Sequence, residues 1–403
     1  MKKNAFTLVE LLAVIAILTI IMVISVPQLI TSIKNKKIDA LEKTKDLLIS
    51  AARNYVIDYE LKVPTSISIE TLCKNDYLEC PIKNPIDNSN LNGYVNVDDN
   101  KVYVYSDTRD YITIRDYIID LYNDESLRTS NVLKKDNTVD TNIRYYGANP
   151  NNYVSFNNEL WRIIGVFGNN VKLVRSESLG SLSWDSSDSS INKGNGINQW
   201  GESTDVNGNT YLGADLQVYL NKMYYGGVET TCYNGADNSE TTCPTNTLDR
   251  TAKLLIDKHT WSLGAIEMSI EDTISFYNAE RGTAKWTGYV ALPYITDWAY
   301  ASSESACETN IQTKDSSNLF VCKNNNWMQR SDWTWYLSPS GQSADASNAW
   351  AVSGNNNYVY YRMFGAMNKF ASFGFDVAPS IYLKSSVLMK GGSGTSSDPY
   401  KLA

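Results

Sequence analysis

The first 60 residues divide into a long apolar run and an amphipathic continuation. Residues 6–26 carry a single charged side chain, Glu10, in 21 positions. At about 1.5 Å per residue, a helix of this length reaches roughly 31 Å, which is enough to cross the hydrocarbon core of a membrane. The pattern therefore predicts a transmembrane helix over 6–26.

Beyond residue 26 the pattern changes to that of an amphipathic helix. Apolar positions recur mostly at three- and four-residue steps with lysines between them, which is typical of a helix with one buried face. We predict a stalk helix over 27–60, in which Pro27 bends the helix rather than ending it. A generic coiled-coil stalk is a less favoured alternative because no heptad pattern is sustained. The recurring positions are Ile30, Ile33, Ile38, Leu41, Leu48, Ala52, Tyr55 and Tyr59.

Residues 61–110 have the pattern of a small β-structure. Two alternating runs, 93–97 and 101–105, flank the turn residues Asp98-Asp99-Asn100, which predicts a pair of antiparallel strands. We expect this head to pack on the C-terminal half of the preceding helix. Residues 111–122 then predict a short helix, and the polar segment 123–142 is typical of a linker.

From residue 144 to 403 the chain predicts a larger, loop-rich α/β module. Asn157-Asn158 lies between two apolar runs and is typical of a tight hairpin turn. Much of the remainder is rich in Asn, Ser and Gly, and long loops on a scaffold often carry function. The overall fold class is α+β. The expected strands are 152–156, 160–167 and 170–175, and the expected helices are 216–221 and 269–281.

Charge and cysteine content narrow the class of protein. The net charge is −8, which argues against nucleic acid as a partner. An even number of cysteines, six, in a chain predicted to be exported suggests disulfides, and of fifteen possible connectivities we favour the local one. The absence of a C-x-x-C motif makes a zinc or thioredoxin-type site improbable. The expected pairs are Cys73 with Cys80, Cys232 with Cys243, and Cys307 with Cys322.

All ten tryptophans lie at or after Trp161. Several fall in polar loops, where exposed rings stack on sugar faces, but Trp is also a common core residue in loop-rich domains. Trp161 and Trp350 lie in strand-like settings and are expected in the core. The candidate ligand platform consists of Trp184, Trp200, Trp327, Trp333 and Trp335.

Metal binding and catalysis have little support in the sequence. Asp205, Asn207 and Asn209 have the oxygen spacing of a calcium loop, but most acidic ligands are missing and a plain turn is favoured. No HExxH, P-loop or G-x-S-x-G motif occurs. His259 ends a predicted helix, 253–259, and is interpreted as structural. We expect a protein that is not an enzyme and has no cofactor, calcium being the weak exception.

The N-terminus resembles that of the type IV pilin and pseudopilin family. The resemblance rests on Lys2-Lys3-Asn4-Ala5 followed by Phe6-Thr7-Leu8-Val9-Glu10-Leu11-Leu12. It implies that residues 1–5 are a leader, that prepilin peptidase cleaves after Ala5, here in place of the usual Gly, and that it methylates Phe6. It also implies that Glu10 pairs with the Phe6 amine of a neighbouring subunit, and that Pro27 is the helix-bending proline that pilins often carry.

The same resemblance implies partners and location. The partners are other pilin subunits and prepilin peptidase; the chain lies in the cytoplasmic membrane before assembly and in an extracellular filament afterwards. The bulk of the C-terminal module favours a minor or tip subunit that presents an adhesion domain. Two alternatives are a membrane-anchored surface protein that never polymerises and a pseudopilin of a secretion or DNA-uptake machine.

A second resemblance covers about Arg144 to Ala403. The runs YVSFNNELWRIIGVF, VKLVRSESLG, FYNAERGT, WYLSPS and APSIYLKSSVLMKGGSGTSSDPY look like a bacterial surface module similar to C-type-lectin-like and formylglycine-enzyme-like folds. Such modules usually carry Arg-Pro before the YLK strand, where this chain has Ala378-Pro379. The resemblance implies a surface ligand, for which a glycan is the candidate class.

Overall fold

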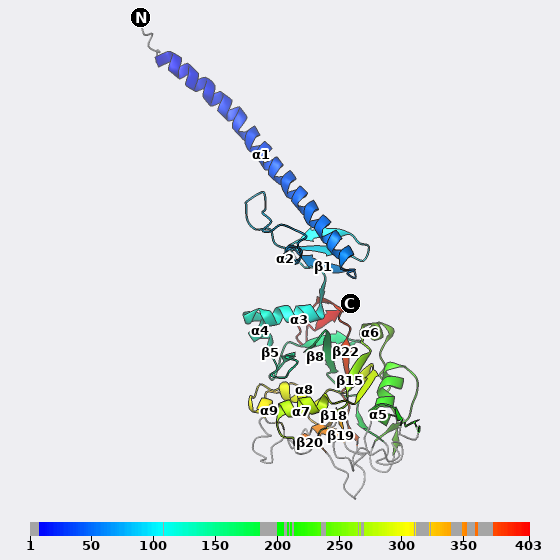
Figure 1. Cartoon of the computed structure of the whole chain (residues 1–403). Helices are drawn as coiled ribbons and strands as arrows, with labels where there is room; N and C mark the ends of the chain where they lie inside the picture. Colours follow the sequence, from blue (N-terminus) through cyan, green and yellow to red (C-terminus); the bar gives the residue numbers. More distant parts are fainter. Residues whose placement is uncertain are drawn as a thin grey trace. The chain divides into compact units, whose positions relative to one another are not determined.

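The protein is described by a computed structural model that divides into two compact units, Met1–Ile112 and Thr113–Ala403. Both units combine helices with β-sheets, so the fold is α+β (Figure 1). Some residues within helices and strands are described by their backbone alone; these are 20–31, 203–204, 210–211, 338–339, 350 and 359–361. The described residues are 8–107, 109–185, 200–204, 208, 210–211, 213–234, 239–264, 266, 270–309, 311, 322, 324–339, 349–352, 359–361 and 374–403.

The first unit is one long helix and a small sheet. Helix α1 spans Leu8–Asp58 and continues through Pro27, as expected. The sheet is antiparallel in the order β1-β2-β3, and the predicted pairing across Asp98-Asp99-Asn100 is confirmed. The strands are β1 (Thr65–Ser68), β2 (Tyr94–Val97) and β3 (Tyr103–Ser106).

The C-terminal part of α1 forms the core of this unit. Leu48 and Ala52 are fully buried and belong to the same cluster as Val95 on β2. Helix α2 (Ile69–Lys74) starts where the Ser68 hydroxyl accepts a hydrogen bond from the Thr71 amide at 3.0 Å, a normal N-cap. The sheet therefore packs on the end of α1 that is farther from the N-terminus.

The first turns of α1 expose apolar side chains. Leu8 and Val9 are each 74% exposed, and Ile17 is 59% exposed. Among the residues that the structure describes, no helix is both long and apolar enough to cross a membrane.

The main sheet of the second unit runs in the order β17-β22-β9-β8-β7-β24-β23, with β6 beside β8 and β5 beside β6. Its predicted hairpin is confirmed: β7 and β8 pair antiparallel around Asn157 and Asn158, whose φ angles are both 56°. Asn tolerates this left-handed conformation and is favoured in such turns. The strands are β5 (Leu133–Lys135), β6 (Ile143–Tyr145), β7 (Tyr153–Phe156), β8 (Glu159–Phe167), β9 (Asn170–Arg175), β17 (Val290–Ala291), β22 (Ser380–Leu383), β23 (Leu388–Gly391) and β24 (Tyr400–Leu402). Strand β4 (Ile112–Thr113) lies at the boundary between the units in the chain.

A second sheet and several short elements complete this unit. The second sheet has the order β10-β21-β18-β19-β20. Its strands are β10 (Ser181–Ser183), β18 (Thr334–Pro339), β19 (Ala349–Val352), β20 (Val359–Tyr361) and β21 (Gly374–Asp376). The two-stranded sheets pair β11 (Ser203–Thr204) with β12 (Thr210–Tyr211), β13 (Cys232–Tyr233) with β14 (Glu240–Thr241), and β15 (His259–Ser262) with β16 (Lys285–Gly288). The helices are α3 (Ile114–Asn123), α4 (Glu125–Asn131), α5 (Asp215–Val218), the π-helix η1 (Tyr219–Tyr225), α6 (Arg250–Leu255), α7 (Thr273–Glu280), α8 (Ile295–Tyr300) and α9 (Ala306–Thr309).

The prediction of a linker over 123–142 is wrong. Most of this segment is regular or buried structure: it contains α4 and β5, and the side chains of Asp136 and Asn142 are buried. Asp136 accepts hydrogen bonds from the Asn142 amide nitrogen at 3.0 Å and from Arg144 Nε at 2.6 Å. The polar residues of this segment form hydrogen bonds inside the protein. A polar sequence is equally compatible with exposure to water, so the sequence alone does not tell the two apart.

The three predicted disulfides are confirmed. Cys73 bonds Cys80, Cys232 bonds Cys243, and Cys307 bonds Cys322. Each closes a local loop, and the last pair is buried in the hydrophobic cluster that includes Ile295 and Trp298. Such loops stabilise a fold mainly by restricting the unfolded chain.

A buried ion network joins distant strands and helices of the second unit. Asp297 on α8 lies 2.8 Å from Arg144 Nη1 and 2.6 Å from Lys172 Nζ, and Arg144 also pairs with Asp136. All four side chains are at most 1% exposed. Burial alone would raise the pKa of Asp297, but the charges of Lys172 and Arg144 outweigh it and lower that pKa to about 2.

A neighbouring acid, Glu280, has the opposite shift. It is fully buried at the end of α7, and burial raises its pKa from 4.5 to about 7. Its carboxyl group accepts hydrogen bonds from the backbone amide and the hydroxyl of Thr296. The folded state holds this proton more tightly than the unfolded chain, so the protonated Glu280 stabilises the fold. This contribution to the free energy of unfolding is complete below about pH 4.5 and is lost as the pH rises through 7.

Replacing Glu280 by Gln is expected to flatten this dependence. A shift of this size corresponds to a loss on the order of 3 kcal/mol between pH 4.5 and 7 in the native chain. Glutamine keeps an acceptor for the Thr296 amide and never ionises, so its loss over the same interval is expected to be much smaller. Urea unfolding at pH 5, 6 and 7 measures the free energy of unfolding of both proteins. If this free energy falls equally steeply with pH in the native chain and in Glu280→Gln, the raised pKa of Glu280 is contradicted.

Candidate functional sites

The processing site and the start of α1 form the first candidate site. Ala5 and Phe6 lie outside the described residues. Glu10 lies in the first turn of α1 and is exposed. A carboxylate there interacts favourably with the helix dipole. Pro27 lies within α1, and its side chain is not described.

The predicted tryptophan platform is wrong for three of its five residues, which are buried in the core. Trp184, Trp200 and Trp335 are at most 1% exposed, and the ring centroids of Trp184 lie 5.0 Å from Trp200 and 5.8 Å from Trp335. Trp327 is 8% exposed, and Trp333 is partly buried and stacks on Phe375. A sugar needs an open ring face, whereas most of these rings fill the interior of the second unit. The core interpretation therefore holds for Trp184, Trp200 and Trp335, as it does for Trp161, which is fully buried, whereas Trp327 also lines a cavity described below.

The weaker site predictions have mixed outcomes. Asp205, Asn207 and Asn209 lie outside the described residues, and no metal-binding group of His, Cys, Asp or Glu occurs within the described part. His259 begins β15 instead of ending a helix, because α6 stops at Leu255. Its ring stacks on Tyr382 at 3.7 Å, in keeping with the structural role expected of it.

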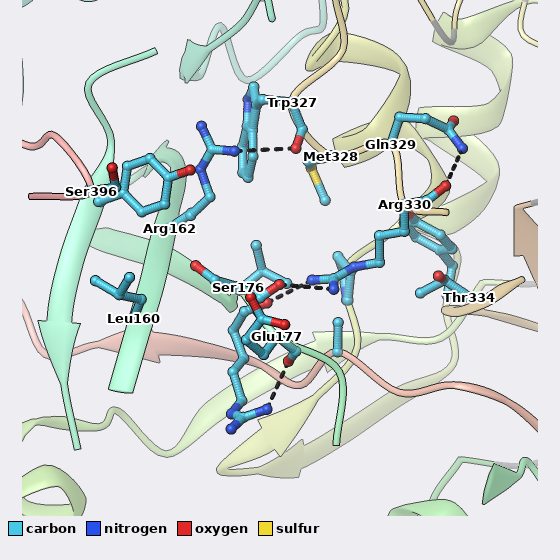
Figure 2. Close-up of a pocket in the computed structure, with 16 residues that line it drawn as sticks. Leu160, Arg162, Ser176, Glu177, Trp327, Met328, Gln329, Arg330, Thr334 and Ser396 are labelled. Atoms are coloured by element: carbon cyan, nitrogen blue, oxygen red, sulfur yellow. Dashed lines mark hydrogen bonds between the residues drawn. The ribbon is translucent and has the colours of Figure 1, made fainter. Parts of the chain in front are cut away.

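A second candidate site, which we call the arginine cavity, lies in the second unit (Figure 2). It has a volume of about 260 Å³. Figure 2 shows Arg162, Ser176, Trp327, Met328 and Arg330 around one open space. The walls come from β7, β8, the end of β9 with the residues after it, the loop before β18, and β18 itself.

Arg162 is held rigidly in the wall of this cavity. Its Nε donates to Asn152 Oδ1 at 2.8 Å, and its Nη1 donates to the Trp327 carbonyl at 3.3 Å. The guanidinium carbon Cζ also lies 4.3 Å from the ring centroid of Tyr153 and 4.5 Å from that of Trp327, as in cation–π contacts. Its Nη2 is buried without a hydrogen-bond partner in the described structure. Burial lowers the pKa of Arg162 to about 10, and the positive charge of Arg330 acts in the same direction.

Arg330 is the second cation of the cavity. Its Nη1 donates to the Ser176 carbonyl at 2.9 Å, and its Nη2 donates to the Arg175 carbonyl at 2.7 Å. Burial lowers its pKa as well. Within the described part of the chain, no ion pair joins Arg330 or Arg162 to a carboxylate. By contrast, Arg175 forms a two-point ion pair with Glu159, at 2.9 and 3.1 Å.

Sequence reasoning named Trp327, which lines the arginine cavity, but missed the two arginines. Arg162 gives a faint signal, because it interrupts the apolar run of β8 between Trp161 and Ile163, both fully buried. Arg330 gives none, because it lies in an irregular polar segment. The two are 168 positions apart (330 − 162), and only the packing of β8 against the loop before β18 brings them to one cavity.

The comparisons with known proteins assign the N-terminus. Residues 1–26 match a family model described as the prokaryotic N-terminal methylation motif. Searches of curated proteins and of solved structures returned no match, so the likeness of the second unit to lectin-like folds stays a prediction. The chain therefore carries the N-terminal motif of type IV pilin-like proteins, which supports its processing by prepilin peptidase.

Proposed function

We propose that this chain is a minor type IV pilin-like subunit of a bacterial surface filament, and that its second unit is an interaction module for adhesion. The observation that carries the proposal is the methylation motif over residues 1–26. In this proposal the chain is cut after Ala5, methylated at Phe6, held in the cytoplasmic membrane by residues 6–26, and then moved into a filament.

The architecture of the chain supports this role. Helix α1 runs without interruption from Leu8 to Asp58 and carries a small sheet on its second half, so an exposed apolar segment precedes a folded head. Three disulfides suit a head that works outside the cell. The second unit, Thr113–Ala403, is much larger than the first, which favours a minor or tip position. We propose binding rather than catalysis for it, since the sequence has no recognised catalytic motif.

Mass spectrometry of the mature N-terminus tests the processing step. The expected result is a chain that begins at Phe6 and carries one N-methyl group. A mature chain that begins at Met1, or at any residue after Val26, would refute the proposal and favour a signal anchor or a secreted protein.

Antibody labelling tests the minor position. Antibody raised against residues 144–403 is expected to label filaments at their ends or at sparse points. Continuous labelling along each filament would show instead that the chain is a main repeating subunit.

A further inference from the structure

We propose that the arginine cavity binds a carboxylated sugar unit, a six-membered ring that carries one negative charge. This inference deepens the interaction role proposed above and rests on it for its biological setting. The site itself is argued from the charge, size and polarity of the cavity.

The charge balance of the cavity selects a single negative charge. Arg175 is neutralised by Glu159, whereas Arg162 and Arg330 form no ion pair with a described carboxylate. Glu177, which is exposed, also lines the cavity and contributes one negative charge. Among the charged residues that line the cavity, leaving aside the Arg175–Glu159 pair, two positive charges and one negative charge leave a balance of +1; Asp376, which does not line the cavity, also acts on Arg330. A carboxylate neutralises this balance, while a doubly charged phosphate would leave excess negative charge beside Glu177.

The polar groups of the walls favour a ligand rich in hydroxyls. Arg162 is 91% buried (100 − 9), and its Nη2 has no partner in the described structure. The hydroxyl of Ser176 is also without a partner there. Buried donors are normally satisfied by protein, water or ligand. Because Ser176 Oγ is buried, a change of the Ser176 side-chain rotamer is needed to bring its hydroxyl to the carboxylate or a ring hydroxyl of a ligand in the cavity.

The size and the apolar walls favour one ring over a chain. About 260 Å³ lies just below the usual range of small-molecule sites, roughly 300–1,000 Å³. Met328, Tyr336 and Leu160 supply apolar surface against which the face of a sugar ring can pack. A fatty acid would need a longer apolar channel, and a peptide end would need space for at least two residues.

Calorimetry on the mature full-length chain in detergent micelles tests the proposal. Glucuronate is the probe, glucose the matched neutral ring, acetate the bare carboxylate, and a tetrapeptide with a free C-terminus the competing class. Glucuronate is expected to bind roughly tenfold or more tightly than glucose or acetate, since a hydrogen-bonded charge contributes that much to affinity. Equal binding of glucose, or tighter binding of acetate or of the peptide, would overturn the proposal.

Two variants test the charge argument. Arg330→Gln is expected to weaken glucuronate binding by about tenfold. Glu177→Gln removes an exposed acid and is expected to tighten binding by roughly threefold. Arg115→Gln is the control, because the Arg115 side chain is 30% exposed, pairs with Asp116 and does not line the cavity. Unchanged affinity in Glu177→Gln overturns the proposal even if Arg330→Gln fails to fold.

The result is separable from the filament role. A methylated Phe6 together with no glucuronate binding would remove the sugar site and leave the pilin-like proposal intact. Specific glucuronate binding by a chain that is never cleaved after Ala5 would support the sugar site and refute the pilin-like proposal.

Discussion

Replacing Asp297 by Ala is expected to lower the free energy of unfolding of the second unit by about 3–5 kcal/mol. The carboxylate forms ion pairs with Arg144 and Lys172 and accepts a hydrogen bond from the backbone amide of Tyr294, all within 2.9 Å. Its removal leaves Arg144 with Asp136 as a partner but deprives Lys172 of its carboxylate. A buried charge that loses its partner keeps the full cost of dehydration.

The aromatic surroundings of Lys172 offset only part of that cost. Its Nζ lies 4.1 Å from the Tyr294 ring centroid and between 5.3 and 5.6 Å from the ring centroids of Phe167, Trp261 and Tyr382. Cation–π contacts of this kind contribute about 2 kcal/mol when the cation is dehydrated. We therefore expect the double change Asp297→Ala with Lys172→Met to cost less than the sum of the two single changes.

Chemical denaturation followed by tryptophan fluorescence measures these changes in the second unit alone, because all ten tryptophans lie at or after Trp161. Asp116→Ala is the control, since its pair with Arg115 is about one-third exposed and such pairs contribute at most about 1 kcal/mol. A loss below 1 kcal/mol in Asp297→Ala would show that the network is not important for stability.

Replacing Glu10 by Ala is expected to abolish incorporation into filaments while leaving cleavage after Ala5 intact. In the proposed function, Glu10 pairs with the methylated Phe6 amine of a neighbour in surroundings of low dielectric constant. A charged side chain in a membrane costs about 2.5–3.5 kcal/mol, so pairing favours assembly by on the order of a hundredfold. Alanine removes both the cost and the pairing, and with them the preference for the assembled state.

Separate readouts distinguish processing from assembly. Mass spectrometry of membrane fractions follows the cleavage of Glu10→Ala, and filament shearing followed by immunoblotting follows its assembly. Glu42→Gln is the matched control, because Glu42 is exposed on the same helix and lies beyond the motif. Normal incorporation of Glu10→Ala would favour a membrane-anchored protein that does not polymerise.

The local features of this fold followed from the sequence. Asn157-Asn158 predicted its hairpin because Asn accepts positive φ, and the cysteines paired with their nearest partners. The course of α1 past Pro27 followed from helical periodicity. In each case the determining contacts lie within a few residues of one another along the chain.

The mistaken predictions share a different cause. Trp184 and Trp335 lie near polar stretches in sequence but pack against each other, and the polar segment containing Asp136 folds around Arg144. Residue type shows that a side chain can be exposed or buried, and only its neighbours in space decide which. A tryptophan in a polar loop therefore says little about ligand binding.

The sequence by itself determined the N-terminal methylation motif, because the motif is a run of neighbouring residues within positions 1–26 and can be recognised without any contact made by folding. The tertiary structure alone decided which charged side chains of the second unit pair with one another and which are buried. Asp297 lies 125 positions from Lys172 and 153 from Arg144, and Arg162 meets Arg330 only across a folded cavity. Electrostatic energies depend on distance and burial, and neither quantity is fixed until the chain has folded.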